Sequence, residues 1–236
     1  MSQTGAPATS LPATRLVVLD MAGTTVADDG LVERAFDAAA ADLGVVAGTE
    51  QHKDMLQYVR DTMGESKISV FRALFGDEDK AQQGNRAFEA AYHDLVDQGH
   101  CAPLPGAEDT IRELRKSGLT VVLTTGFSGP TQQRILAALG WQDLADLALC
   151  PADAGGRGRP YPDLALAALL RTGGADDVRE MAVVGDTGYD MLCGARSGAG
   201  VVAGVLTGAH GAQRLRADGA THVLATIADL PAALVR

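Results

Sequence analysis

Aspartates follow apolar runs at two widely separated places in this chain. Leu16–Leu19 leads directly into Asp20, and Met181–Val184 leads through a glycine into Asp186, with Asp190 four residues later. An apolar run ending in a carboxylate is typical of a strand that presents this group at its carboxyl end, where open α/β sheets bind ligands. Mg²⁺ prefers oxygen ligands, and phosphoryl transfer needs its negative charge neutralised. Each motif alone also fits a turn or a helix start, where aspartate is common.

Two further segments carry hydroxyl or guanidinium groups next to predicted strands or helices. The apolar run Val121–Leu123 leads into Thr124, Thr125 and a glycine, which predicts a strand that ends in hydroxyls, or simply a strand that meets a turn. Arg159 follows a glycine-rich segment and precedes a predicted helix, with Arg157 as a rival in the same segment. An arginine offers a rigid fork of donors that binds a phosphonate or carboxylate through two hydrogen bonds.

These four segments, in this order, resemble the motifs of the haloacid dehalogenase (HAD) superfamily. The resemblance implies that Asp20 is a nucleophile and that Thr125, or alternatively Thr124, binds the phosphoryl oxygens. It implies that Mg²⁺ is held by Asp20, the backbone carbonyl of Ala22, Asp186 and Asp190. Because the dehalogenases do not need the metal carboxylates, the presence of Asp186 and Asp190 favours phosphorus chemistry over dehalogenation.

Three departures from the usual HAD pattern occur together. Ala22 stands where HAD phosphatases carry a second aspartate as general acid, Arg159 stands where they carry lysine, and Met63-Gly-Glu-Ser-Lys67 lies in the helical insert. Together they resemble the phosphonatase (phosphonoacetaldehyde hydrolase) family. That family carries Asp-x-Ala-Gly-Thr-Thr, Gly-Arg-Pro-Tyr-Pro and a lysine shortly after Met-Gly, which here are Asp20–Thr25, Gly158–Pro162 and Lys67.

The resemblance implies a mechanism that explains the missing general acid. Lys67, as a neutral amine, forms an iminium with the substrate aldehyde, so that the carbon leaves phosphorus as an enamine. Asp20 accepts the phosphoryl group, and water then releases phosphate. No leaving oxygen needs a proton, so alanine at position 22 is consistent with this chemistry. The implied substrate-binding residues are Gly23, Thr24, Met63, Gly126 and Arg159.

The match to the phosphonatase family is incomplete. The family has histidine where this chain has Val70, and tyrosine where it has Phe127. The chain therefore resembles a phosphonatase-like sister group, acting on phosphonoacetaldehyde or a close 2-oxoethylphosphonate. Histidines that could replace the missing one lie in the insert: His52, His93 and His100. The alternatives are a HAD phosphomonoesterase acting on a small phosphorylated metabolite, or a non-catalytic phosphate-binding protein.

The hydrophobic periodicity of the sequence predicts the helices and strands that position these residues. Helical spacing dominates residues 31–100, with windows at 31–43, 50–62, 67–75 and 81–97, and no convincing strand interrupts them. From residue 101, helical windows and short apolar runs alternate as far as Val205, which predicts βαβ units. We therefore predict an α/β fold: a Rossmann-like HAD core with a mostly parallel sheet (residues 15–30 and 101–236), an inserted α-helical cap (31–100) and a flexible tail (1–14).

Composition limits the partners. The formal net charge of −10 disfavours nucleic-acid binding, which needs clustered Lys and Arg, and no apolar run is long enough for a membrane span. The 3 cysteines are widely spaced, which suits reduced thiols in the cytoplasm. We expect a small phosphonate or phosphate as the only substrate partner. The family resemblance further implies a homodimer that forms through the cap.

Overall fold

The computed structural model describes residues 13–234, and its centre is a six-stranded parallel sheet. The strand order is β3-β2-β1-β4-β5-β6, and each neighbouring pair is parallel. The strands are β1 (Leu16–Asp20), β2 (Thr120–Thr124), β3 (Leu147–Leu149), β4 (Met181–Gly185), β5 (Val201–Val205) and β6 (His222–Leu224). The predicted α/β class with a parallel sheet is confirmed.

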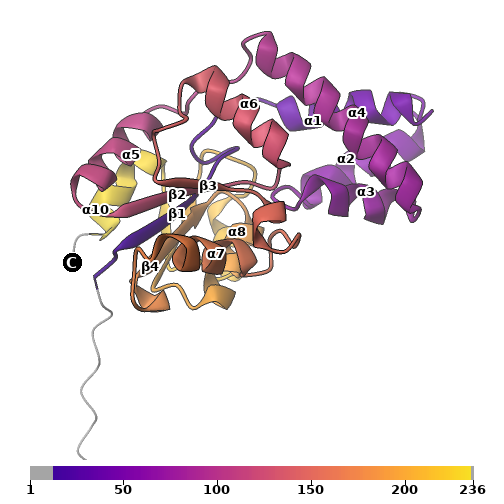
Figure 1. The fold of residues 1–236 in the computed structure, drawn as a ribbon. Helices are drawn as coiled ribbons and strands as arrows, with labels where there is room; N and C mark the ends of the chain where they lie inside the picture. Colours follow the sequence, from indigo (N-terminus) through magenta and orange to yellow (C-terminus); the bar gives the residue numbers. More distant parts are fainter. Residues whose placement is uncertain (1–12, 235–236) are drawn as a thin grey trace, which may run out of the picture.

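The apolar character of the central strands explains their position. Every residue of β1, β4 and β5 is buried, which is expected of a parallel sheet covered on both faces. Figure 1 shows α5 and α10 on one side of the sheet and α7 and α8 on the other. The helices after the insert are α5 (Ala107–Lys116), α6 (Gly129–Leu139), α7 (Asp163–Thr172), α8 (Gly188–Ser197), α9 (Ala212–Ala217) and α10 (Leu230–Leu234).

The insert at residues 31–100, which follows β1, is a bundle of four helices that lies to one side of the sheet (Figure 1). These are α1 (Leu31–Asp42), α2 (Glu50–Asp61), α3 (Lys67–Phe75) and α4 (Glu78–Asp97). Aromatic rings fill its interior: Phe36 stacks on Phe71 with centroids 4.8 Å apart, and it lies 4.7 Å from Phe88. These rings belong to the same apolar cluster as residues of β1 and β2. We refer to the four-helix bundle below as the cap.

Two backbone connections join the cap to the sheet, and they run beside each other. Ala27 N–H donates to the Ala102 carbonyl, and Leu104 N–H donates to the Thr25 carbonyl, both at 2.9 Å. Entry and exit of the cap are therefore fastened together close to Asp20. This pairing places the first residues of the cap next to the carboxyl edge of the sheet.

The sequence pattern missed the last part of the sheet. It gave no element after Val205, whereas the chain continues through α9, β6 and α10. These elements have 6, 3 and 5 residues, which is too short for a period to be recognised. Residues 1–12 of the predicted tail lie outside the described residues. Within residues 13–234, no helix is long and apolar enough to cross a bilayer.

One buried hydroxyl in the cap lacks a hydrogen bond. Tyr92 is completely buried, and its hydroxyl has no partner among the described residues. A buried polar group without a partner costs about 1–3 kcal/mol. We therefore expect Tyr92→Phe to raise the free energy of unfolding by about 1 kcal/mol in urea denaturation, whereas Tyr161→Phe, at an exposed tyrosine, should leave it unchanged. A loss of stability in Tyr92→Phe would contradict this account.

Candidate active site

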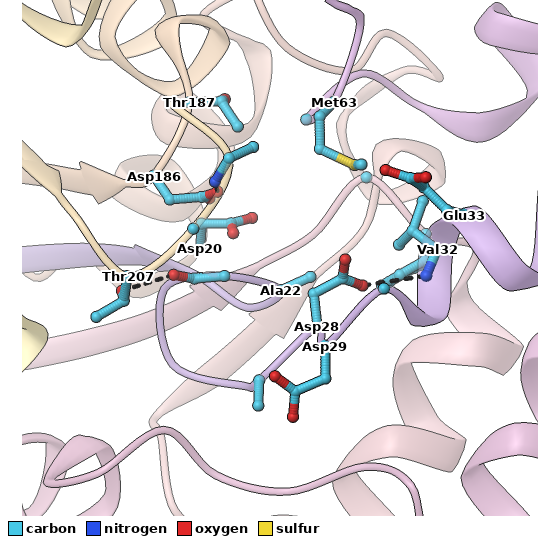
Figure 2. Close-up of a pocket in the computed structure, with 18 of the residues that line it drawn as sticks. Asp20, Ala22, Asp28, Asp29, Val32, Glu33, Met63, Asp186, Thr187 and Thr207 are labelled. Atoms are coloured by element: carbon cyan, nitrogen blue, oxygen red, sulfur yellow. Dashed lines mark hydrogen bonds between the residues drawn. The ribbon is translucent and has the colours of Figure 1, made fainter. Parts of the chain in front are cut away.

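A cavity of about 310 Å³ lies between the carboxyl edge of the sheet and the cap. Figure 2 shows Asp20 and Asp186 on the core side and Met63 and Glu33 on the cap side. Its volume is at the small end of the range for ligand pockets, which suits a small metabolite. The core side contributes loops after β1, β2, β4 and β5, and the cap side contributes Met63, Gly64 and Lys67.

A buried arginine links two carboxylates at the bottom of this cavity. Arg159 Nη2 lies 2.7 Å from Asp20 Oδ1, and Arg159 Nε lies 2.6 Å from Asp190 Oδ1. Arg159 Nη2 also donates to the Thr124 hydroxyl at 2.8 Å. The rival Arg157 lies outside: it pairs with Asp163 and covers the ring of Tyr161. Arg159 is thus the guanidinium that the fold brings to Asp20.

Burial determines the charge balance of this group. Burial raises the pKa of Asp20 well above its ordinary value, the positive charge of Arg159 opposes that rise, and the neighbouring carboxylates add to it. Burial also works against the charge on Arg159, but Asp190 and Asp20 outweigh it, so the pKa of Arg159 is raised. An ionised Asp20 therefore needs positive charge close by.

Asp186 and Asp190 are held by different contacts. Asp186 Oδ1 accepts a hydrogen bond from the Thr24 hydroxyl at 3.3 Å, and its Oδ2 accepts one from Ala209 N–H at 2.8 Å. Asp190 Oδ2 accepts hydrogen bonds from both the backbone N–H and the hydroxyl of Thr187, which forms a capping box at the start of α8. Both oxygens of Asp190 are thus in contact with protein groups.

The donor set suits a magnesium ion. Three buried carboxylates, Asp20, Asp186 and Asp190, share a single buried guanidinium, so negative charge exceeds positive charge when all are ionised. Burial raises the pKa of Asp186 to about 7, and Asp190 adds to the rise. Among the described residues no group of three or more His, Cys, Asp or Glu side chains is arranged as a complete metal site. Because Asp20, Ala22 and Asp186 line the cavity and Asp190 does not, we expect Asp20, Asp186 and the Ala22 carbonyl to be the direct ligands and Asp190 to position Arg159.

Magnesium binding can be tested through stability. A ligand at about a hundred times its dissociation constant stabilises the folded state by about 2.7 kcal/mol, so we expect MgCl₂ to raise the melting temperature relative to EDTA. Asp186→Asn should lose most of this rise without lowering the melting temperature in EDTA, because burial already disfavours its charge. The exposed cap residue Asp54 provides the control, Asp54→Asn. An undiminished rise in Asp186→Asn would place the metal elsewhere.

Lys67 reaches the same cavity from the cap. It is the first residue of α3 and is only 8% exposed, with its Nζ 5.2 Å from the centroid of the Phe127 ring. Burial lowers the pKa of Lys67, Asp28 and Asp20 oppose the shift, and Arg159 adds to it. A lysine with a lowered pKa has more of the neutral amine that can act as a nucleophile near neutral pH.

The cap loop that precedes Lys67 lies directly on the core. A Cβ at Gly64 would lie 2.5 Å from the Thr187 hydroxyl, and a Cβ at Gly126 would lie 2.7 Å from the Glu65 carbonyl. Lys67 N–H also points at the Gly126 carbonyl, 3.4 Å away. Glycines at these two positions therefore allow the cap loop to approach the core closely, and the cap lies closed over the sheet.

Comparison with known proteins agrees with this geometry. A family model described as haloacid dehalogenase-like hydrolase matches residues 14–198, which is most of the chain. The chain belongs to this family. The predicted superfamily is confirmed, and the protein is a hydrolase.

Relatives of this HAD hydrolase have different activities in their names. "Probable phosphatase IndB" of Dickeya dadantii is 27% identical over 86% of this chain and 85% of its own. Phosphonoacetaldehyde hydrolase of Bordetella avium is 30% identical over 81% and 71% of the two chains. A solved phosphonoacetaldehyde hydrolase-like protein from Oleispira antarctica aligns with a TM-score of 0.79 at 23% identity, covering 94% and 91%, which shows the shared fold.

Most of the site residues predicted for this HAD hydrolase meet at the cavity, but Thr24, Thr125 and Asp190 do not line it. Asp20, Arg159, Asp186 and Lys67 line it, as do Ala22, Gly23, Met63 and Gly126. Thr24 is instead buried and does not line the cavity, and its hydroxyl donates a hydrogen bond to Asp186. The hydroxyl of Thr125 accepts a hydrogen bond from Phe127 N–H, whereas that of Thr124 contacts Arg159. The hydroxyl in contact with Arg159 is therefore that of Thr124, which was the alternative candidate in the sequence analysis.

The positions that differ from the phosphonatase pattern have different surroundings. Val70 is buried in the apolar core of the cap, away from the cavity, and Phe127 lines the cavity beneath Lys67. Of the three candidate histidines, His52 contacts Asp37 and His93 contacts Thr131. Among the described residues that line the cavity there is no histidine.

Several residues that line the cavity of this HAD hydrolase were not predicted from the sequence, among them Asp28, Thr187 and Thr207. Thr207 donates to the Gly23 carbonyl at 2.7 Å and so fixes the loop after Asp20. It follows the apolar strand Val201–Val205 and precedes a glycine, which is the same pattern that drew attention to Thr125. Asp28 had no such signal, because it lies where the chain leaves the core for the cap.

Proposed function

We propose that this HAD hydrolase cleaves the carbon–phosphorus bond of phosphonoacetaldehyde or a close 2-oxoethylphosphonate. The observation that carries the proposal is the meeting of two nucleophiles of different kinds: the Lys67 amine and the Asp20 carboxylate line one small cavity from opposite sides. An ordinary phosphate ester has no carbonyl group for a buried amine to attack. A substrate with an aldehyde and a phosphonate separated by one carbon would use both groups.

The residues can divide the reaction into successive steps. Neutral Lys67 attacks the aldehyde carbon, and loss of water leaves an iminium two bonds away from phosphorus. Asp20 then attacks phosphorus in line with the carbon–phosphorus bond. The electrons of that bond move into the iminium to give an enamine, so no acid is needed at position 22. Water hydrolyses the aspartyl phosphate, and hydrolysis of the enamine, after its protonation, frees Lys67.

Arg159 supports the phosphoryl step. Its contacts with Asp20 and Asp190 hold the guanidinium beside the attacking oxygen, where it can neutralise the phosphonate oxygens. Bound Mg²⁺ would supply further positive charge there and favour the ionised form of Asp20. The free cysteines, Cys101, Cys150 and Cys193, support the proposal that the enzyme works in a reducing compartment such as the cytoplasm. Homodimerisation through the cap stays a prediction.

The test is phosphate release from phosphonoacetaldehyde with MgCl₂, with and without sodium borohydride. We expect release of phosphate, and substrate-dependent inactivation by borohydride with a mass adduct on Lys67. Trapping without phosphate release would indicate a different 2-oxo phosphonate. If the protein shows neither trapping nor phosphate release, the result would favour the alternative of a phosphomonoesterase. The relative named a probable phosphatase supports that alternative. A panel of phosphate esters would then be assayed.

A further inference from the structure

Imine formation at Lys67 requires a group that moves protons. This inference rests on the proposed function. Between an ammonium with an aldehyde and an iminium with water, two protons must pass from nitrogen to the departing oxygen. A positioned acid–base group accelerates such transfers. Because no histidine lines the cavity among the described residues, another titratable group must carry these protons.

Asp28 is a carboxyl group in the right place. It lies where the chain passes from the core into the cap, and its side chain lines the cavity together with Lys67. One oxygen accepts a hydrogen bond from Val32 N–H at 3.1 Å, which fixes the carboxyl at the start of α1. Figure 2 shows this carboxyl pointing toward the space beside Met63, whereas that of the adjacent Asp29 points away.

The charges of Asp28 and Lys67 influence each other. Burial raises the pKa of Asp28, while the Val32 hydrogen bond and the charge of Lys67 oppose the rise. Burial lowers the pKa of Lys67, and Asp28 is the charge that opposes this shift most strongly. The two shifts bring the proton affinities of carboxyl and amine closer together, which favours exchange of a proton between them.

The other acidic groups of the cavity are occupied. Glu33 forms two hydrogen bonds with Arg60, at 2.9 and 2.7 Å. Asp20 pairs with Arg159, and Asp186 accepts hydrogen bonds from Thr24 and Ala209. Both also belong to the phosphoryl side of the cavity. The exposed Asp29 also lines the cavity, but its carboxylate points away from the space beside Met63 (Figure 2). Of the described acids that line the cavity, this leaves Asp28 as the one that points into that space.

We propose that Asp28 is the general acid–base of imine formation, transferring protons between Lys67 and the carbonyl oxygen of a 2-oxoalkyl phosphonate. Asp28 as carboxylate takes a proton from the Lys67 ammonium. The amine attacks the carbonyl carbon, and the oxygen receives that proton from Asp28. Asp28 removes a second proton from nitrogen and delivers it to the hydroxyl group. Water leaves as the nitrogen lone pair forms the C=N bond, and Asp28 is again a carboxylate.

The test is the rate of borohydride trapping with phosphonoacetaldehyde, measured by rapid quench. Asp28→Asn keeps an oxygen for Val32 N–H but cannot exchange protons, and we expect trapping and phosphate release to slow together by about 10²-fold or more. The control is Asp29→Asn, which removes the same charge next to Asp28 and should trap at the wild-type rate. Formate should partly restore trapping in Asp28→Ala but not in a variant without Lys67.

A second pair of variants distinguishes loss of the ionisable group from a folding defect. Asp28→Glu and Asp28→Gln have equal length and differ in the ionisable group, so Asp28→Glu should trap faster. Equal rates in this pair, or a wild-type rate in a folded Asp28→Asn, would overturn the role of Asp28 and leave the proposed function intact. Wild-type protein that neither traps nor releases phosphate would overturn the proposed function, and this inference with it.

Discussion

Asp20→Asn is expected to abolish phosphate release while leaving the borohydride adduct on Lys67. Asparagine keeps the shape of the side chain and an oxygen that can face Arg159, but it lacks the negative charge that attacks phosphorus. Removal of a catalytic nucleophile costs about 10⁴-fold or more in turnover. Imine formation uses Lys67 on the cap side of the cavity, and loss of the Asp20 charge lowers the pKa of Lys67 further, which favours its neutral amine. Phosphate is measured by single-turnover release and the adduct by mass spectrometry.

Asp29→Asn serves as control, because it removes the carboxylate of an exposed residue at the cavity, which points away from the space beside Met63 (Figure 2). Asn also tolerates the positive φ of 41° found at this position. The control should release phosphate at the wild-type rate. Turnover in Asp20→Asn above about one hundredth of wild type would mean that another group accepts the phosphoryl, and loss of the adduct would mean that the two sides of the cavity do not act separately.

Lys67→Met is expected to abolish both the adduct and the cleavage of phosphonoacetaldehyde. Methionine fills the buried space over Phe127 without an amine, so no iminium forms and the carbon would have to leave phosphorus as an unstabilised carbanion. We expect a fall of about 10⁴-fold or more in phosphate release. The melting temperature should not fall, since burial already disfavours the charged lysine.

Lys67→Arg separates charge from nucleophilicity. Arginine keeps the positive charge but stays protonated, so it should be as inactive as Lys67→Met. If the lysine serves only to attract a phosphate group, Lys67→Arg should retain much of its activity. The exposed cap lysine Lys53 supplies the matched control, and Lys53→Met should behave as wild type.

The sequence predicted the elements up to Val205 more completely than those that follow it, α9, β6 and α10. Continuous apolar strands such as Leu16–Leu19 are recognisable because both faces are buried, and four helical windows in the cap agree with α1 to α4. The window at 81–97 began too late, because α4 begins at Glu78, where Asp77 caps the helix by accepting a hydrogen bond from Lys80 N–H. Local periodicity does not register such a polar first turn.

The candidate site was predictable where a residue follows a strand and hidden where it depends on tertiary contacts. Asp20 and Asp186 are marked by the apolar runs before them. The choice between Thr124 and Thr125 depends on which hydroxyl faces Arg159, and this is set by the register of β2 against β1, in which Thr124 pairs with Asp20. Asp28 lines the same cavity as Lys67 only because the cap folds back over the sheet.

The paired connections at Ala27 and Leu104 make the cap an insertion whose two ends leave the core side by side. Such a segment can be exchanged or redesigned as one unit in evolution without breaking the sheet. In the proposed mechanism the phosphoryl acceptor, Asp20, belongs to the core, whereas Lys67, the amine proposed to activate the leaving group, belongs to the insertion. A change of cap would therefore change which bond to phosphorus is broken, while the residue that receives the phosphoryl group remains the same.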